Sequence, residues 1–157
     1  MSISINFDYF EKIKTFLQRL TFDLNEATQE TAKRLASRAE YLAKKRVKSP
    51  YQKPLMGTGK YFRSIQSGFA KGGGLFVGKV ESNSPIAGII EFGSPPHKIK
   101  ARGNKFLFWP GAKHPVNEVN HPGTPPFRVL RNATEESVEE IEKVFRSVLK
   151  QKYNWIS

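Results

Sequence analysis

The sequence predicts an α+β fold in which a long N-terminal helix and a C-terminal helix pack on a small antiparallel β-sheet, with an extended loop or arm between sheet and second helix. Three observations support this. Apolar residues recur with helical spacing at both ends of the chain, two apolar segments flank three consecutive glycines, and a proline-rich stretch precedes the second helix. The 157 residues suit a single domain, expected over 1–157.

The first helix is expected over residues 8–47. Apolar residues recur every three or four positions; they are Phe10, Ile13, Leu17, Leu20, Leu24 and Ala27, and the pattern resumes at Leu35, Ala39 and Leu42. Asp23, Thr28 and Thr31 leave a break or kink near residues 21–25 open, and Pro50 ends the helix. Forty helical residues span about 60 Å, so we expect part of this helix to pack on another subunit.

The sheet is expected within residues 60–92. Residues 65–71 and 75–81 are typical of strands, and Gly72-Gly73-Gly74 between them indicates a hairpin. Residues 86–92 form a third apolar segment, either a strand or a short helix.

Alternation in the second strand places Leu75 and Val77 on one face and Phe76 and Val80 on the other. Because both faces carry apolar residues, we expect the sheet to be covered on at least part of both faces.

Residues 93–125 are expected to form an extended arm rich in proline and glycine, in which residues 105–109 and 116–120 could pair as short strands. Long irregular segments are uncommon in compact domains and usually functional. We therefore expect this arm to become ordered on assembly.

The last helix is expected over residues 125–152. Thr124 is the predicted cap, and Pro125 and Pro126 suit a first turn.

The net charge is +12, and nine basic but only two acidic residues fall between residues 51 and 110. A basic sheet-and-loop region can face nucleic acid or an acidic protein partner, and a soluble surface with Lys-rich loops is the alternative. The candidate contacts with DNA or an acidic partner are Lys98, Lys100, Arg102 and Lys105. The absence of cysteine excludes disulfides and thiolate metal sites. We expect no signal peptide and no membrane span, and the absence of cysteine fits production in the cytoplasm.

The candidate catalytic and metal-binding residues do not form a recognisable site. His97, His114 and His121 lack the i, i+4 helical spacing of a zinc protease, and two of them precede proline. We interpret Glu91, in an apolar segment, as the partner of a Lys or Arg side chain, because no second carboxylate or nucleophile accompanies it. We therefore predict no enzymatic activity, no metal and no cofactor.

The sequence argues against nucleotide binding and leaves nucleic-acid binding open. Gly72-Gly73-Gly74 and Thr58-Gly59-Lys60 lack the spacing of a phosphate-binding loop. The aromatic residues among basic ones at 60–63 and 105–109 could stack on bases, although such residues are more often core or interface anchors.

Four patterns occur in one order along the chain. They are Thr58-Gly59-Lys60-Tyr61-Phe62-Arg63-Ser64-Ile65, then Ala87-Gly88-Ile89-Ile90-Glu91-Phe92-Gly93-Ser94, then Lys105-Phe106-Leu107-Phe108-Trp109, and finally His121-Pro122-Gly123-Thr124 before Pro126-Phe127. Together they resemble the tail-completion, or head–tail joining, proteins of long-tailed bacteriophages. Tyr61 stands where leucine is usual, and Ser94 replaces threonine. The resemblance covers about residues 25–150. Its motif residues are Thr58, Gly59, Ser64, Ile65, Glu91, Phe92, Gly93, His121, Pro122, Gly123 and Phe127.

This resemblance implies a structural virion protein located at the head–tail junction. The assembly that the resemblance implies is a hexameric ring of identical chains, made in the host cytoplasm. The ring contacts head connector or adaptor proteins on one side and the tail terminator or tail tube protein on the other. DNA would cross its lumen with non-specific contact. The adjacent tail-terminator or head–tail adaptor ring is an alternative position in the neck. A sequence-independent nucleic-acid-binding module is the alternative of another class.

Overall fold

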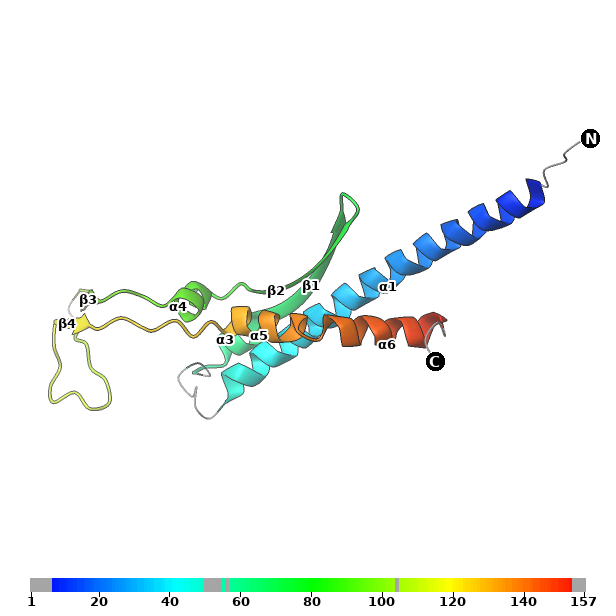
Figure 1. The fold of residues 1–157 in the computed structure, drawn as a ribbon. Coiled ribbons are helices and arrows are strands. Elements are labelled where there is room, and N and C mark those ends of the chain that lie inside the picture. The colour runs from blue at the N-terminus through cyan, green and yellow to red at the C-terminus, as the bar shows by residue number, and fades with distance from the viewer. Residues whose placement is uncertain (1–6, 50–54, 56, 104, 154–157) are drawn as a thin grey trace, which may run out of the picture.

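The computed structural model describes residues 7–49, 55, 57–103 and 105–153, which form an elongated molecule (Figure 1). The predicted α+β class is confirmed. The helices are α1 (Phe7–Lys48), α3 (Lys60–Ser64), α4 (Ala87–Phe92), α5 (Val129–Val138) and α6 (Ile141–Tyr153). Strands β1 (Ile65–Gly72) and β2 (Leu75–Ser82) form one antiparallel hairpin, and β3 (His97–Lys100) and β4 (Glu118–His121) form another antiparallel pair.

Helix α1 is continuous over 42 residues, about 63 Å. No break occurs near residues 21–25. The Thr21 and Thr28 hydroxyls donate to carbonyls four residues earlier, so both side chains find partners within the helix. Phe16 and Leu17 in the N-terminal half are 64% and 53% exposed. The expected packing of this half on another subunit stays a prediction. The Phe10 side chain and Pro50 lie outside the described residues.

One face of the β1–β2 hairpin packs on α1. The register runs from Ile65 opposite Ser82 to Gly72 opposite Leu75. At Gly78 the strand approaches the helix so closely that an added Cβ would lie 2.4 Å from the Ala32 carbonyl oxygen. This close contact gives glycine a steric role in β2.

The other face of the hairpin is open, so the expectation that both faces are covered is wrong for the isolated chain. Leu75 and Val77 are 68% and 50% exposed. The physical reason is that α1 is the layer that packs on this hairpin, and α5 and α6 lie chiefly against α1.

The Glu40 side chain connects α1 to β1. Its carboxylate accepts hydrogen bonds from the Ser67 amide (2.8 Å) and hydroxyl (2.6 Å). The Lys44 ammonium, followed by these Ser67 donors, lowers the pKa of Glu40 below its ordinary value. The carboxylate is therefore stabilised in its charged form by the folded arrangement.

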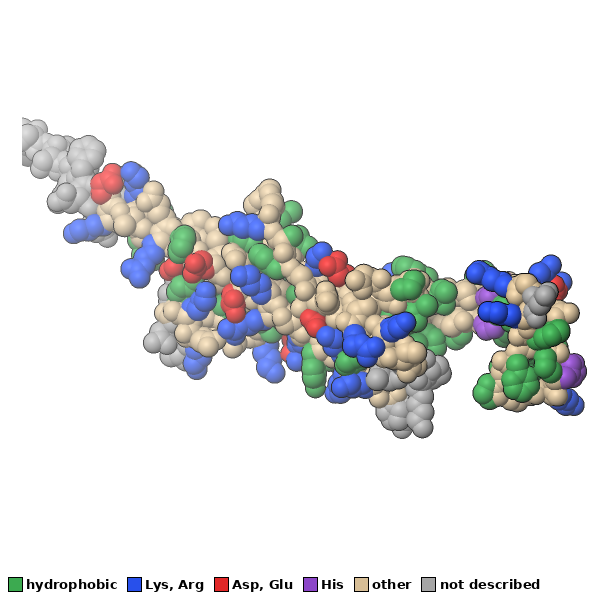
Figure 2. Space-filling view, turned by 180° about the vertical axis from the view of Figure 1, so that it is seen from behind, with side chains coloured by type: hydrophobic (Ala, Val, Ile, Leu, Met, Phe, Trp, Pro, Cys, Tyr) green, Lys and Arg blue, Asp and Glu red, His purple; other side chains and the backbone are tan. Residues whose placement is uncertain are grey.

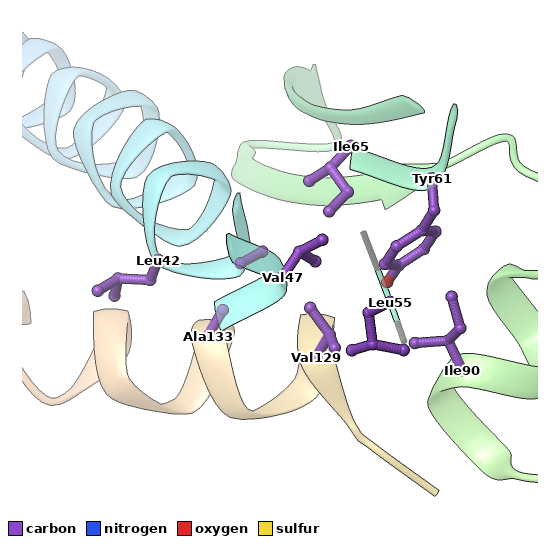
Figure 3. Packing of buried hydrophobic residues seen from close by; sticks show 9 residues of the cluster. Leu42, Val47, Leu55, Tyr61, Ile65, Ile90, Val129 and Ala133 are labelled. Atoms are coloured by element: carbon purple, nitrogen blue, oxygen red, sulfur yellow. The ribbon is translucent and has the colours of Figure 1, made fainter. Parts of the chain in front are cut away.

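The principal core lies where α1, α3, α4, α5 and β1 converge (Figure 3). Its buried members are Leu42, Ala43, Val47, Leu55, Tyr61, Ile65, Ile90, Val129 and Ala133. A second cluster of Ala27, Val148 and Leu149 joins α1 to α6. Two ion pairs, Arg38–Glu140 and Arg46–Glu136, accompany these contacts between α1 and the C-terminal helices.

The predicted C-terminal helix over 125–152 is replaced by two helices, α5 and α6, with a turn at residues 139–140. Helix α5 begins only at Val129, because the Thr124 backbone pairs with Ser94 and the Phe127 amide donates to the Ile90 carbonyl. Thr124 is therefore not the cap, and Pro125 and Pro126 precede the helix rather than forming its first turn.

The region expected to contain the sheet, 60–92, holds the hairpin flanked by α3 and α4; the third apolar segment is a helix, α4. Strand pairing in the arm also differs from the prediction. Residues 97–100 pair with 118–121, and the expected pairing of 105–109 with 116–120 is reduced to a single bridge between Leu107 and Val116. Prolines at 110 and 115 have no amide to donate, which disfavours a longer ladder there.

Candidate assembly site: the arm and its root

The arm, residues 93–125, leaves the body as two adjacent extended segments (Figure 1). At its base the Ser94 amide donates to the Thr124 carbonyl (2.9 Å) and the Thr124 amide donates to the Ser94 carbonyl (3.0 Å). We call this base, with the preceding Gly93 and Gly123, the arm root. The backbone itself therefore fixes where both segments of the arm leave the body.

Both glycines of the arm root are required by close backbone contact. Gly93 has φ 76°, and a Cβ there would lie 2.4 Å from the Thr124 carbonyl oxygen. Gly123 has φ 89°, and a Cβ there would lie 2.3 Å from the Ser94 carbonyl oxygen. A side chain at either position would combine an unfavourable backbone conformation with a clash against backbone.

Glu91 caps helix α5 from outside that helix. Its two carboxylate oxygens accept from the Leu130 amide (2.7 Å) and the Arg131 amide (3.3 Å). Arg128, at the cap position, has φ 51° and makes no side-chain capping bond. Among the described residues, the partners of Glu91 are thus backbone amides at the positive end of a helix, rather than the Lys or Arg side chain expected from the sequence.

The first motif lies beside this cap. Tyr61 is 1% exposed, and burial raises the pKa of its phenol, with the nearby Glu91 carboxylate raising it further. Ile65 is fully buried in the same core. The Ser64 hydroxyl lies 2.6 Å from that of Ser82 on β2. The first two patterns of the sequence therefore meet in space.

Two other members of the first motif shape the turn before α3. Gly59 has φ 74°, and its carbonyl accepts from the Arg63 amide (3.0 Å). The Thr58 carbonyl accepts from the Arg63 guanidinium (3.2 Å). These contacts are local, so the turn has a structural role and brings no side chain to the arm.

The last motif forms the return path of the arm. The His121 Nδ1 atom accepts from the Gly123 amide (3.1 Å), and the His121 ring lies 5.0 Å from the His97 ring, centroid to centroid. Phe127 packs against the core, whereas Pro122 is exposed. Phe92, next to the arm root, is 81% exposed.

The four basic candidates lie on the arm, where they are exposed. Lys98 and Lys100 both pair with Glu118, at 2.8 and 3.4 Å. The Lys98 ammonium, and then that of Lys100, lowers the pKa of Glu118. Because Glu118 is the single acidic residue of the arm against five Lys and Arg residues, the arm keeps a net positive charge.

The end of the arm exposes large aromatic side chains. Phe106, Phe108 and Trp109 are 63%, 68% and 42% exposed. Figure 2 shows this end standing apart from the body, with hydrophobic, basic and histidine side chains close together on it. A polypeptide end of this composition has no core of its own, which is typical of a segment that binds another surface.

An apolar groove lies on the body between α1, β2 and the α5–α6 pair. Its volume is about 680 Å³, and its walls include Leu35, Phe76, Val138, Ile141 and Phe145. The sequence analysis did not predict this groove, because it depends on how two distant helices flank α1. A local signal was present: Ala32, Ala36 and Ala39 place small side chains on one face of α1, and all three line the groove.

Within the described residues, no group of three His, Asp or Glu side chains is placed to hold a metal ion, and His114 does not join the His97–His121 pair. None of the described helices has the length and hydropathy required to cross a bilayer.

No protein-family model, curated protein or solved structure matches this chain.

Proposed function

We propose that this chain is a structural virion protein of a tailed-phage neck, where a ring of copies completes the tail and joins it to the head connector around the DNA channel. The observation that carries this proposal is the arm. It is anchored at its root by backbone pairing, stands away from the body, and ends in exposed aromatic and basic side chains. Such a segment suits binding between subunits better than chemistry on a small substrate.

The placement of the motifs supports the same proposal. Tyr61, Glu91, Gly93 and Gly123 come from three separate patterns, yet all lie at or beside the arm root. Glu91, Gly93, His121 and Gly123 hold the arm root or the start of α5. Thr58, Gly59, Ser64 and Ile65 instead shape the turn before α3 or pack in the core and against β2. The second and fourth patterns therefore include the residues that set the geometry of the arm.

The proposed partners follow from this role. Copies of the chain form the ring, which we take to be hexameric; connector or adaptor proteins lie on the head side, and the terminator or tube protein lies on the tail side. Arg102 and Lys105, exposed on the arm, would contact acidic surfaces or the phosphates of DNA in the lumen without reading sequence. A tail-terminator or head–tail adaptor ring uses the same geometry at a neighbouring position.

The experiment is an early stop codon in the gene, introduced into a phage that encodes the chain, followed by negative-stain electron microscopy of the particles. DNA-filled heads and separate tails, or tails of abnormal length, are expected, and a plasmid-borne copy of the gene restores joined particles. Joined and infectious particles without the protein would overturn the proposal.

A sequence-independent nucleic-acid-binding module is the second candidate, favoured by the excess of basic residues on the arm. It requires DNA binding by the isolated chain whose affinity falls steeply with salt. Fluorescence anisotropy with duplex and single-stranded DNA at increasing salt distinguishes the two: loss of that binding in an arm variant, with particle assembly intact, would favour the second candidate.

A further inference from the structure

The groove on the body has an apolar wall that is accessible to a partner. Val138 and Ile141 are 50% and 51% exposed, and both line it, together with Phe76 and Phe145. The floor is formed by small side chains of α1, including Ala36. This combination of a shallow small-residue floor and apolar walls accommodates inserted aromatic side chains.

The aromatic end of the arm has the matching chemistry, and its side chains are exposed in the isolated chain. In both Figures 1 and 2 it stands away from the body, beyond the arm root. Residues 94–106, thirteen in all, run from the arm root to the aromatic end, a length of chain that spans at most about 40 Å. In the two views the arm carries this end away from the body.

The arm and the surface beside the groove differ in charge. The arm carries five basic residues and one acidic residue, and that acidic residue is already paired with Lys98 and Lys100. Glu142, which pairs with Arg146, and Lys79 line the groove, and the exposed Glu135 and Glu139 precede Glu142 in the chain without lining it. Opposite charges favour encounter and fix orientation more than they add affinity.

We propose that the arm of one copy places Phe106, Phe108 and Trp109 in the apolar groove of the next copy, with the basic side chains of the arm near the exposed Glu135 and Glu139. This inference rests on the proposed ring function and names the partner of the arm as a second copy of this chain. Arm and groove are different surfaces, so the contact is head-to-tail, and a head-to-tail contact closes into a ring when its rotation permits.

Disulfide trapping tests this contact cleanly, because the chain has no cysteine. Ala112→Cys places a thiol three residues from Trp109, and Thr134→Cys places one on the groove. The full-length single variants are purified, mixed at high concentration and oxidised mildly. Covalent heterodimers are expected, and a chain carrying both cysteines is expected to give a ladder of multimers.

The matched control is Ala70→Cys, which lies on the exposed face of the hairpin. Mixed with Ala112→Cys, it should give at least about tenfold less heterodimer. Trp109→Ala in the arm variant should lower trapping by about tenfold or more, because a buried aromatic anchor commonly contributes a decade or more in affinity. Lys105→Glu should also lower trapping, and Glu139→Lys in the groove variant should restore it.

Three outcomes would overturn the inference. The first is equal trapping with the groove and control cysteines, and the second is a predominance of disulfides between two arms. The third is a small apolar molecule found in the groove by native mass spectrometry, with trapping absent. None of these outcomes changes the result expected from the stop codon. The two experiments therefore distinguish failure of this contact from failure of the proposed function.

Discussion

Replacement of Glu91 by alanine should destabilise the protein by about 2 kcal/mol. The variant loses the acceptor for the Leu130 amide at 2.7 Å and for the Arg131 amide at 3.3 Å. A lost cap costs about 1–2 kcal/mol, and a hydrogen bond to a charged group contributes about 1.5–3 kcal/mol. One of the two bonds is long, which places the expected cost in the middle of these ranges.

Glu91→Gln should cost about 1 kcal/mol, because an amide oxygen can keep the Leu130 bond but brings no negative charge to the helix end. Urea unfolding followed by circular dichroism measures the free energy of unfolding. Hydrogen exchange reports the two amides directly, and both should exchange faster in the alanine variant.

The control for this prediction is Glu81→Ala, which removes an exposed partner of Lys79 and should change the stability by less than about 0.5 kcal/mol. The capping argument is refuted if Glu91→Ala costs no more than this control. It is also refuted if stability falls while exchange at Leu130 and Arg131 stays unchanged.

Three further substitutions test other contacts. Gly93→Ala should cost at least about 2 kcal/mol and expose the arm-root amides to hydrogen exchange, because its φ of 76° is strained for alanine; Gly72→Ala, where the added Cβ meets nothing within 4 Å, is the control. Gly78→Ala should cost about 1–3 kcal/mol by urea unfolding, since its Cβ would meet the Ala32 carbonyl at 2.4 Å, and an unchanged midpoint would contradict this. The pKa of Glu40 is lowered from 4.5 in the folded protein. The charged carboxylate therefore stabilises the folded state above that value, and this stabilisation is lost as the pH falls through the folded pKa. Glu40→Gln should therefore be less stable at neutral pH but lose less stability on acidification, and parallel pH curves would count against the argument.

Local signals were sufficient for the first half of the fold. The three-four spacing of Ile13, Leu17 and Leu20 predicts a helix regardless of distant contacts, and α1 is that helix. The three glycines at 72–74 likewise predict a hairpin from local backbone preferences, and β1 and β2 flank them with the expected bounds to within one residue.

The start of α5 could not be predicted in the same way. Thr124 and the two prolines form a plausible local start for a helix, but the capping carboxylate belongs to Glu91, about forty residues earlier. The Thr124 backbone pairs with Ser94 in the arm root and therefore does not cap the helix. A tertiary contact thus overrides a local preference, and this is also why the role of Glu91 was assigned wrongly.

The exposed apolar surfaces of the molecule were predicted only in part. The length of α1 indicated that part of it extends beyond the domain, and the proline-rich stretch indicated an arm. Exposure of Leu75 and Val77 was not foreseen, because alternation along a strand reports apolar residues on both faces without telling which face receives a helix. The groove depends on the same missing information, namely the side of α1 on which α5 and α6 lie.

In the proposed ring, helix α5 would connect the two contact surfaces of one subunit. Its first turn is held by Glu91 beside the arm root, and its last residue, Val138, lies on the wall of the groove. Ten residues of helix are about 15 Å of stiff rod. A side chain that displaced Val138 would therefore act on the first turn of α5 as well, so the groove and the arm root of one subunit would not move independently.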